Sequence, residues 1–275
     1  MTAELDLLDA VYRAPDDDAP RLAYADVIAG SSPDWAEFIR LQVARAEVER
    51  RARAPVGTPS AREAALLAAN YAAWGHYIER YVRDAPVPRA DDQGWLFDRG
   101  FVAFVRMEPE NFAALGDELF AMAPIQHADL YGGDAGGARA LLASPQLAKL
   151  DSLSLWRTGL DDDDAVALAS CEFLRRATWL DLSDNQIGPR GVEALAASPI
   201  LANKVVVDLR GNPCDPGDQP SYDWDGSLAW SYPSARADEI EAKLGRAVPW
   251  FHYLRLSQVP DRFHAKWYAP PTAER

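Results

Sequence analysis

Leu180-Asp-Leu-Ser-Asp-Asn-Gln-Ile-Gly188 is the stretch of sequence that decides the fold. Its opening motif recurs at three other places, Ala128-Asp-Leu-Tyr131, Leu153-Ser-Leu-Trp156 and Val207-Asp-Leu-Arg210. The four copies are spaced by 25, 27 and 27 residues. A fixed period of about 20 to 50 residues indicates stacked structural repeats. We therefore expect each copy to begin one repeating unit.

The first three copies are each followed by a stretch of helical periodicity with many small residues, at 138–147, 164–174 and 191–201. One strand and one helix cannot bury their apolar side alone, so such units stack and share a continuous core. The apolar positions of consecutive units match in order: Leu153, Leu155, Leu160, Leu168 and Leu174 correspond to Leu180, Leu182, Ile187, Leu195 and Leu201.

An amide side chain also recurs in phase with the strands. Asn185 and Asn212 occupy the same position after their strands, and Thr158 occupies it in the preceding unit. A buried amide at this point can form hydrogen bonds with the backbone of the turn. With these motifs, the segment from about 125 to 214 resembles leucine-rich repeats of the long, ribonuclease-inhibitor-like type. The resemblance implies a short solenoid with parallel strands, whose apolar ends must be capped.

Residues 1–93 are predicted to be helical. One face of the first helix carries Leu5, Leu8, Val11 and Tyr12. A second helix is expected over 20–28, stopped by Gly30 in the left-handed conformation. A third begins at Ser32-Pro33, where serine can cap and proline suits the first turn. A fourth follows the capping box Ser60-Ala-Arg-Glu63.

Two motifs in this helical region carry a second resemblance. They are the run Asp16-Asp-Asp-Ala-Pro-Arg-Leu-Ala-Tyr-Ala-Asp26 and the run Ala36-Glu-Phe-Ile-Arg-Leu-Gln42. Residues 3 to 47 resemble the bacterial repeat-companion domain that often precedes such repeats. That family usually has Tyr-Ala-Asp-Trp-Leu where this chain has Tyr24-Ala-Asp-Val-Ile28. The resemblance implies a fold but no assigned chemistry.

The expected fold class is therefore α/β, with four segments along the chain. A helical capping domain (1–93) is followed by a strand-helix connector (94–124). In the connector, the alternation of apolar and polar residues from 94 to 107 predicts a short hairpin or strand pair before a helix at 109–122. The repeats (125–214) come next, then a C-terminal cap (215–275) that combines a hairpin, a helix at 234–244 and an aromatic tail. One continuous core is expected from the helical cap through the repeats.

Composition narrows the possible partners. The 275 residues are 48% hydrophobic and 25% charged, as in a folded protein, and carry a net charge of −14 with a pI near 4.7. Nucleic acid and anionic membranes would be repelled by much of such a surface. The acidic N-terminus and the lack of a long apolar stretch predict a cytoplasmic protein. The isolated Cys171 and Cys214 are expected to be packing residues, and no cofactor is expected.

Three acidic runs invite a metal-binding interpretation, but a structural one is favoured for each. Asp161 to Asp164 suit a solvated helix N-terminus, so replacing Asp162 and Asp163 with Asn should cost little stability and leave calcium affinity unchanged. Asp16 to Asp18 also precede a helix. Asp223-Trp-Asp-Gly226 lacks the remaining acids of a calcium loop and is predicted to be a hairpin turn.

A surface formed by the strands is the candidate binding site. Because side chains alternate between the two faces of a strand, residues beside the strand leucines point onto an exposed concave face. One column contains Asp129, Ser154, Asp181 and Asp208. A second contains Tyr131, Trp156, Ser183 and Arg210, while His127 and Trp179 lie on the other side.

The charges on this surface indicate the kind of partner. Asp181 and Asp208 should lie on adjacent strands about 4.8 Å apart, where they repel unless Arg210 or a bound cationic group compensates them. The aromatic rings of Trp156 and Tyr131 beside these acids favour a partner that bears Arg or Lys.

We therefore expect a non-catalytic scaffold that binds a protein through the concave face of its repeats. A regulatory or inhibitory module acting on a neighbouring gene's product is an alternative that needs only the same surface. The alternative from another class is an acid- or metal-dependent enzyme. Its site would lie between the helical domain and the repeats, at His127, Asp129 and Asp151.

Overall fold

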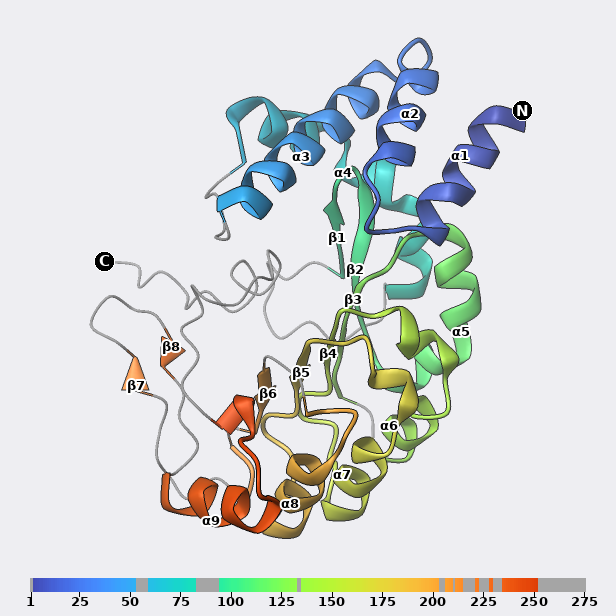
Figure 1. Ribbon diagram of the computed structural model, residues 1–275. Helices are drawn as coiled ribbons and strands as arrows, with labels where there is room; N and C mark the ends of the chain where they lie inside the picture. Colours follow the sequence, from blue (N-terminus) through green and yellow to red (C-terminus); the bar gives the residue numbers. More distant parts are fainter. Residues whose placement is uncertain are drawn as a thin grey trace, which may run out of the picture.

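The computed structural model describes residues 2–52, 59–82, 94–132, 135–202, 206–209, 211–214, 221–222, 228–229 and 234–251 (Figure 1). In these ranges the chain begins with helices α1 to α4 and continues with a six-stranded sheet whose parallel strands alternate with helices. A two-stranded hairpin and helix α9 follow. The predicted α/β class, with an N-terminal helical region and a mostly parallel repeat sheet, is confirmed.

The N-terminal helices have a small core of their own. It is enclosed by α1 (Thr2–Arg13), α2 (Ala19–Ile28) and α3 (Pro33–Ala52). Its buried members are Val11, Tyr24, Ala25, Ile28, Ala36, Ile39, Val43 and Phe101. The prediction for Leu5 is wrong, because its side chain is 56% exposed and lies outside the face of α1 that enters this core.

The end of α2 also differs from the prediction. Gly30 does not have a positive φ, and Ala29 continues the right-handed conformation of the helix. The reason is that two serine N–H groups close the turn. Those of Ser31 and Ser32 both donate to the carbonyl oxygen of Ile28, at 3.1 and 2.7 Å. No left-handed residue is needed to close this turn.

Helix α4 (Ala61–Val82) begins with half of the predicted capping box. The Glu63 N–H donates to Ser60 Oγ at 3.1 Å, as expected. The Glu63 carboxylate instead accepts hydrogen bonds from Arg45 at 2.9 Å and from Gln42 at 3.2 Å. The pairing with α3 therefore replaces the second bond of the box.

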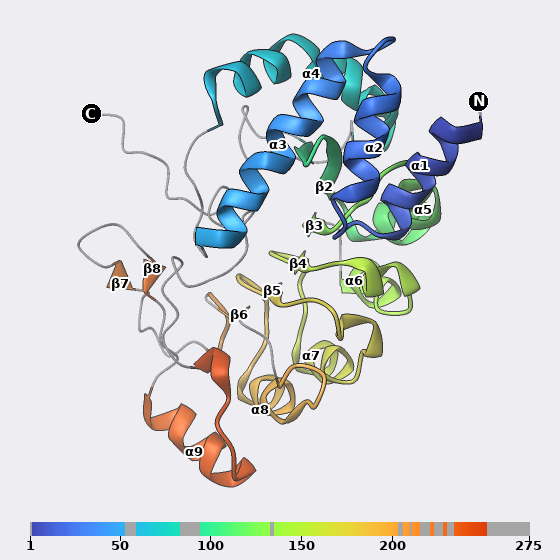
Figure 2. The ribbon, with the colours of Figure 1, turned by 45° about the horizontal axis from the view of Figure 1, so that its top comes forward.

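The predicted strand pair is confirmed and is continuous with the repeat sheet. Strand β1 is antiparallel to β2, and each later strand is parallel to the one before it. The strands are β1 (Trp95–Asp98), β2 (Phe101–Met107), β3 (His127–Leu130), β4 (Ser152–Ser154), β5 (Trp179–Asp181) and β6 (Val206–Asp208). Figure 2 shows β2 to β6 side by side in chain order, with α5 to α8 along one side.

Helices return the chain from one strand to the next on that outer side. They are α5 (Pro109–Met122), α6 (Ala135–Leu141), α7 (Asp162–Ala169) and α8 (Pro189–Ala197). Two of the predicted helical stretches are in fact split, because 3-10 helices η1 (Pro145–Lys149) and η2 (Glu172–Leu174) follow α6 and α7. The α5 boundaries agree with the prediction.

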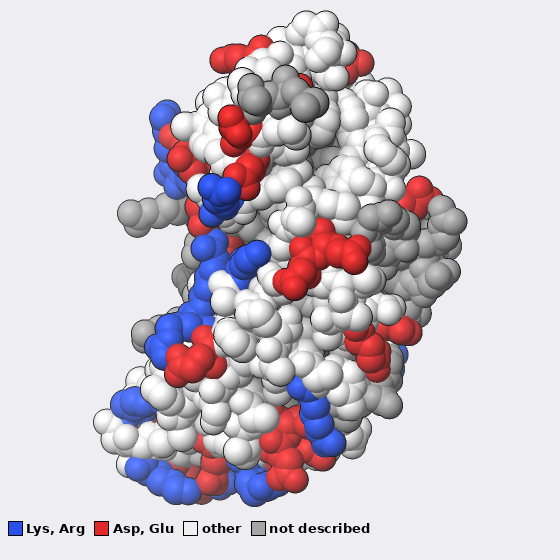
Figure 3. All heavy atoms as spheres, turned by 90° about the vertical axis from the view of Figure 1, so that its right-hand side faces the viewer, with Lys and Arg blue, Asp and Glu red and all other residues white. Residues whose placement is uncertain are grey.

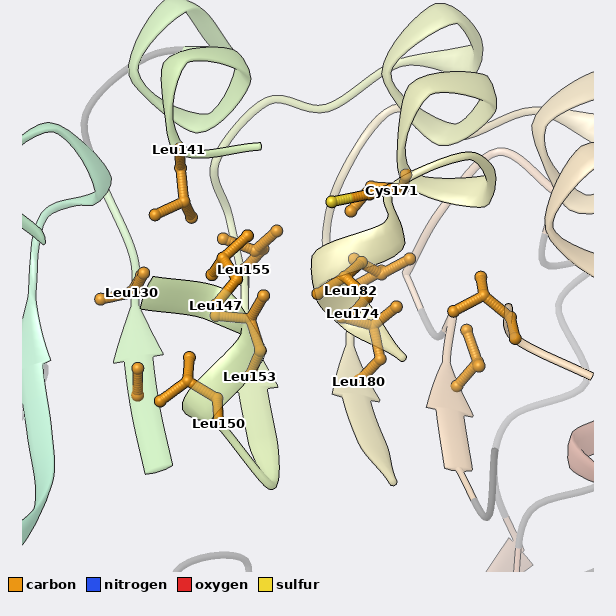
Figure 4. Packing of buried hydrophobic residues seen from close by; sticks show 14 of the residues in the cluster. Leu130, Leu141, Leu147, Leu150, Leu153, Leu155, Cys171, Leu174, Leu180 and Leu182 are labelled. Carbon is orange, nitrogen blue, oxygen red and sulfur yellow. The ribbon is translucent and has the colours of Figure 1, made fainter. Parts of the chain in front are cut away.

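One core connects the helical region to the end of the repeats. It contains Phe38 and Ile78 from the N-terminal helices as well as Trp250 near the C-terminal end of the described chain. Within the repeats, Leu130 of β3, Leu153 of β4 and Leu180 of β5 point toward the helical side, which contributes Leu141, Leu147 and Leu174 (Figure 4). Both cysteines are free and buried there, and burial raises the pKa of the Cys171 thiol. The predicted packing role of the cysteines is confirmed.

The recurring asparagines bond to the backbone of the turns, as predicted, and in addition join consecutive units. Asn185 is 1% exposed; its Oδ1 accepts from the N–H groups of Thr158 (3.0 Å) and Leu160 (3.1 Å). Its Nδ2 donates to the carbonyls of Leu155 (2.8 Å) and Leu182 (2.9 Å). The asparagine of one unit thus completes the backbone hydrogen bonds of the unit before it.

Asn212 repeats this arrangement one unit later. Its Nδ2 donates to Leu182 O and Leu209 O, and its Oδ1 accepts from the Ile187 N–H at 2.9 Å. The side chain is also buried.

The turn between α1 and α2 is fastened to the start of the sheet by a buried arginine. Arg99, in the β1–β2 turn, donates to Asp98 Oδ2 (2.8 Å), Asp18 Oδ1 (3.1 Å) and Gln126 Oε1 (2.9 Å). Burial acts to lower the pKa of Arg99, but the carboxylates of Asp98 and Asp18 outweigh it and raise the pKa. Arg99 therefore stays charged at the centre of this contact.

Asp16, in the same turn, forms hydrogen bonds with residues of the repeats. Its carboxylate accepts from Gln126 at 2.9 Å and from Arg176 at 2.8 Å, while Arg176 also donates to Asp151 at 2.8 Å. Burial alone would raise the pKa of Asp16, but its bond with Arg176 and the nearby charges lower it. The predicted structural role of the Asp16–Asp18 run is confirmed, although in it only Asp17 caps α2 through its side chain.

The acidic run at the start of α7 is a helix N-terminus, as predicted, but it is not simply solvated. Asp161 and Asp164 form a reciprocal capping box, and Asp164 is 2% exposed and paired with Arg139. Asp162 Oδ1 accepts from the N–H groups of Gly188 and Gly191, at 2.7 and 2.8 Å. It therefore caps α8 of the next unit, whose own N-cap residue, Gly188, offers no side chain.

Replacing Asp162 with alanine is accordingly expected to lower the free energy of unfolding by about 1–2 kcal/mol, the usual effect of removing a helix cap. Asp163→Ala is the matched control, because this neighbour is 76% exposed and pairs only at the surface with Arg190. It should change stability by no more than about 0.5 kcal/mol. Urea unfolding followed by circular dichroism measures both, and equal effects would contradict the assignment.

The C-terminal elements partly match the predicted cap. Strands β7 (Ser221–Tyr222) and β8 (Leu228–Ala229) pair antiparallel, α9 (Ser234–Leu244) agrees with the prediction, and η3 (Pro249–Phe251) follows. Trp250 and Phe251 are buried against the core. The turn Asp223–Gly226 and the tail aromatics Tyr253, Phe263, Trp267 and Tyr268 lie outside the described residues.

Candidate partner-binding face

The strand register aligns the predicted columns. Asp129, Ser154, Asp181 and Asp208 are direct neighbours on consecutive strands. Arg106 of β2 continues this column before Asp129, and its guanidinium donates to Asp129 Oδ2 at 2.8 Å. On the other side, His127 and Trp179 share a register position, as predicted, with Ser152 between them.

The predicted exposure is wrong for most of the described residues in these columns, although Asp129, Trp156 and Ser183 are partly exposed. Asp181 is 2% exposed and Asp208 is 5% exposed. Four further predicted residues are also buried: His127, Tyr131, Ser154 and Trp179. A physical reason is that neighbouring side chains bond to one another: Asp181 Oδ1 accepts from Ser183 N (2.9 Å) and Ser183 Oγ (2.6 Å), and Ser154 Oγ lies 3.5 Å from Asp181 Oδ2.

The structure also removes the predicted need for a cationic group to compensate the charges of Asp181 and Asp208. Asp181 has the serine donors described above, and Asp208 has an interaction partner as well. Arg210, which was expected to compensate them, lies outside the described residues. Burial of the acids removes the observation that favoured a partner bearing Arg or Lys.

The three residues of the enzymatic alternative do not converge. His127 Nδ1 lies 2.7 Å from Ser152 Oγ, Asp129 pairs with Arg106, and Asp151 pairs with Arg176 and Gln126. The described ranges also contain no group of three or more His, Cys, Asp or Glu side chains that could hold a metal ion.

The exposed part of the face is the edge at which the strands end. Trp156 is partly exposed, and its indole Nε1 donates to Asp184 Oδ2 at 2.8 Å. Its ring packs against Tyr131, with centroids 5.7 Å apart, and the Arg157 guanidinium lies 5.1 Å from its centroid. We call Trp156, Arg157 and Asp184 the edge cluster.

The backbone of the edge cluster is unusual in a way that repeats along the solenoid. Arg157 and Asp184 have positive φ angles of 55° and 53°, and the residues at the same phase in the flanking units are Gly132 and Gly211, at 74° and 72°. A side chain in this conformation costs about 1 kcal/mol, which glycine avoids. Two central units thus keep charged side chains where the outer units have glycine.

Arg157 and Asp184 were missed as site residues by the sequence analysis, although Trp156 and Ser183 beside them were included. The signal was present in the alignment of the four motifs. At this position, which precedes Thr158, Asn185 and Asn212, the two central units have Arg157 and Asp184, whereas the outer units have glycine. Strained non-glycine residues concentrate at functional sites, so this contrast marks a candidate.

A comparison with family models identifies the repeat. Residues 178–196 match the family model described as Leucine Rich repeat. The match begins just before β5 and covers the Asn185 turn and most of α8. This stretch is therefore similar to a leucine-rich repeat, and it lies within the parallel sheet of stacked units. Comparisons with curated proteins and with solved structures give no match.

Leucine-rich repeats generally serve as protein-binding scaffolds and are typically non-catalytic. In the described part of the chain, no helix is both long and apolar enough to cross a membrane. Figure 3 views the molecule from the side on which α1 and α5 lie in Figure 1 and shows acidic and basic groups next to each other over its lower part. The lower part of this side therefore does not carry charge of one sign only, which would attract ligands of the opposite charge.

Proposed function

We propose that this chain is a non-catalytic scaffold that binds a partner protein through the concave face of its repeats, at the edge where the strands end. One observation carries the proposal: Trp156 is held in a fixed orientation by Asp184 and Tyr131 and yet remains partly exposed. Large aromatic side chains that are oriented before binding lose little conformational entropy, which favours them as interface anchors.

The buried members of the two columns support this edge from below. Ser154 and Asp181 bond through Ser183 toward the turn that carries Asp184, and the Asp129–Arg106 pair fixes the start of the column. We propose that His127, Trp179 and Asp208 complete the same face, with Arg210 beside them. The partner then contacts chiefly the edge cluster, together with Ser183, while the buried Tyr131 ring supports Trp156.

A photo-cross-linking amino acid tests the location of the interface. p-Benzoylphenylalanine placed at position 156 should yield a discrete adduct with a protein from the native lysate. The control position is Val166, which is 41% exposed on α7, on the opposite side of the sheet. An adduct that forms equally well from both positions, or from 166 alone, would rule out the edge as the interface.

Trp156→Ala is expected to weaken binding of the cross-linked partner by about 2 kcal/mol, roughly 30-fold, as for a typical aromatic anchor. The melting temperature should change little, because the indole is partly exposed and its hydrogen bond with Asp184 lies at the surface. Val166→Ala is the matched control and should bind like the wild type. Isothermal titration calorimetry measures both, and equal affinities for all three proteins would exclude Trp156 as an anchor.

A further inference from the structure

The edge cluster also indicates the chemistry of the partner. We infer that the partner presents a carboxylate, from an Asp or Glu side chain, to the guanidinium of Arg157. This inference rests on the proposed function, since it concerns the same surface, but it is opposite in charge to the partner expected from sequence.

Arg157 already occupies the position over the Trp156 ring that a cation of a partner would take. A cation binds an aromatic ring over its face, within about 6 Å of the centroid. The guanidinium of Arg157 lies 5.1 Å from the Trp156 centroid, and the Tyr131 ring lies 5.7 Å away. The chain therefore supplies its own cation to this ring, which leaves less of the ring for an Arg or Lys of a partner.

Arg157, in contrast, retains most of its hydrogen-bonding capacity. Its side chain is 64% exposed. The partners that the described residues offer its guanidinium are the Trp156 ring and the Asp184 carboxylate, whose Oδ2 is 3.6 Å from Nε. A guanidinium has five N–H donors and no acceptor. Stacking on a ring leaves its edge open, and that edge matches both oxygens of a carboxylate.

Asp184 is the exposed acid that could instead attract a basic partner, but it has a positioning role. Its Oδ2 accepts the Trp156 indole N–H at 2.8 Å and also faces Arg157. The carboxylate thus lies between the two groups that it orients. A cation from a partner would have to compete with both of them, whereas a carboxylate meets the unused donors of Arg157.

The net charge of −14 does not prevent this interaction. At physiological ionic strength the Debye length is about 8 Å, so exposed charges farther away are largely screened. The field of the whole molecule lowers the rate of association with an acidic partner, while the local charge of Arg157 determines its bound geometry.

A random peptide library displayed on phage tests the inference without knowledge of the natural partner. Selection on the full-length chain should enrich peptides that contain Asp or Glu. Synthetic copies of these peptides should bind Arg157→Glu at least about tenfold more weakly than the wild type, since charge-assisted hydrogen bonds are lost and repulsion is added. Arg157→Lys should retain part of the affinity, because it keeps the charge without the planar fork.

Arg190→Glu is the matched control, because Arg190 is 62% exposed but lies on α8 and pairs with Asp163. It should bind the peptides like the wild type. Enriched peptides rich in Lys or Arg, with unchanged or tighter binding to Arg157→Glu, would overturn the inference while leaving the edge as the interface. Peptides that bind Trp156→Ala as tightly as the wild type, or the absence of any enrichment, would count against the proposed function itself. Melting temperatures of all variants confirm that they are folded.

Discussion

Replacing Asn185 with alanine is expected to lower the free energy of unfolding by about 4 kcal/mol or more. The substitution leaves the backbone groups of Thr158, Leu160, Leu155 and Leu182 without their side-chain partner in the core. A buried polar group without a hydrogen bond costs about 1–3 kcal/mol. Because whole domains are stable by only about 5–15 kcal/mol, this variant should be close to the limit of folding.

Urea unfolding followed by circular dichroism measures this effect. Asn70→Ala is the matched control, because its amide makes one bond, to Leu66 O within α4, and is only half-buried. Its loss should be about 1 kcal/mol or less. If Asn185→Ala does not fold, Asn185→Thr provides the measurement, since Thr158 already occupies this phase and should give an intermediate loss. A loss below 1 kcal/mol for both variants at Asn185 would disprove the role assigned to the amide.

Arg99→Met is expected to destabilise the protein by about 3–5 kcal/mol, as is usual when one partner of a buried ion pair is removed. The methionine roughly fills the space but leaves the buried Asp98 carboxylate and Gln126 Oε1 without the guanidinium. It also releases Asp18, and with it the turn that joins the N-terminal helices to the sheet. Thermal and urea unfolding both measure the loss.

Arg51→Met is the control for this substitution. Arg51 is 78% exposed and pairs with Glu47 on the same helix, so its replacement should change stability by no more than about 0.5 kcal/mol. If Arg99→Met were as stable as Arg51→Met, the bonds of Arg99 would not contribute to the attachment of the helical region to the sheet.

The sequence allowed the repeat architecture to be predicted because its signals are local and periodic. The alternation of Leu180 and Leu182 with Asp181 specifies which face of the strand is buried, and the regular spacing aligns Asp181 with Asp208. Asn185 follows from the same phase. Helix α5 could be bounded because Pro109 begins it and the apolar period continues to Met122.

The remaining features depend on contacts that no local pattern reveals. Asp16 meets Arg176 across 160 positions of the chain, and the burial of Asp181 depends on neighbours from other units. Alternation predicts the direction in which a side chain points but not whether another group covers it. For the same reason the acids were expected to define the site, while the exposed Arg157 was overlooked.

The direction of the asparagine bonds has a consequence for synthesis on the ribosome. Asn185 completes backbone groups at 155, 158 and 160, and Asn212 completes those at 182 and 187. The units that begin with β4 and β5 therefore remain unfinished until the unit after each of them has left the exit tunnel. Until then, the growing end of the nascent chain carries backbone groups that await the asparagine of the next unit.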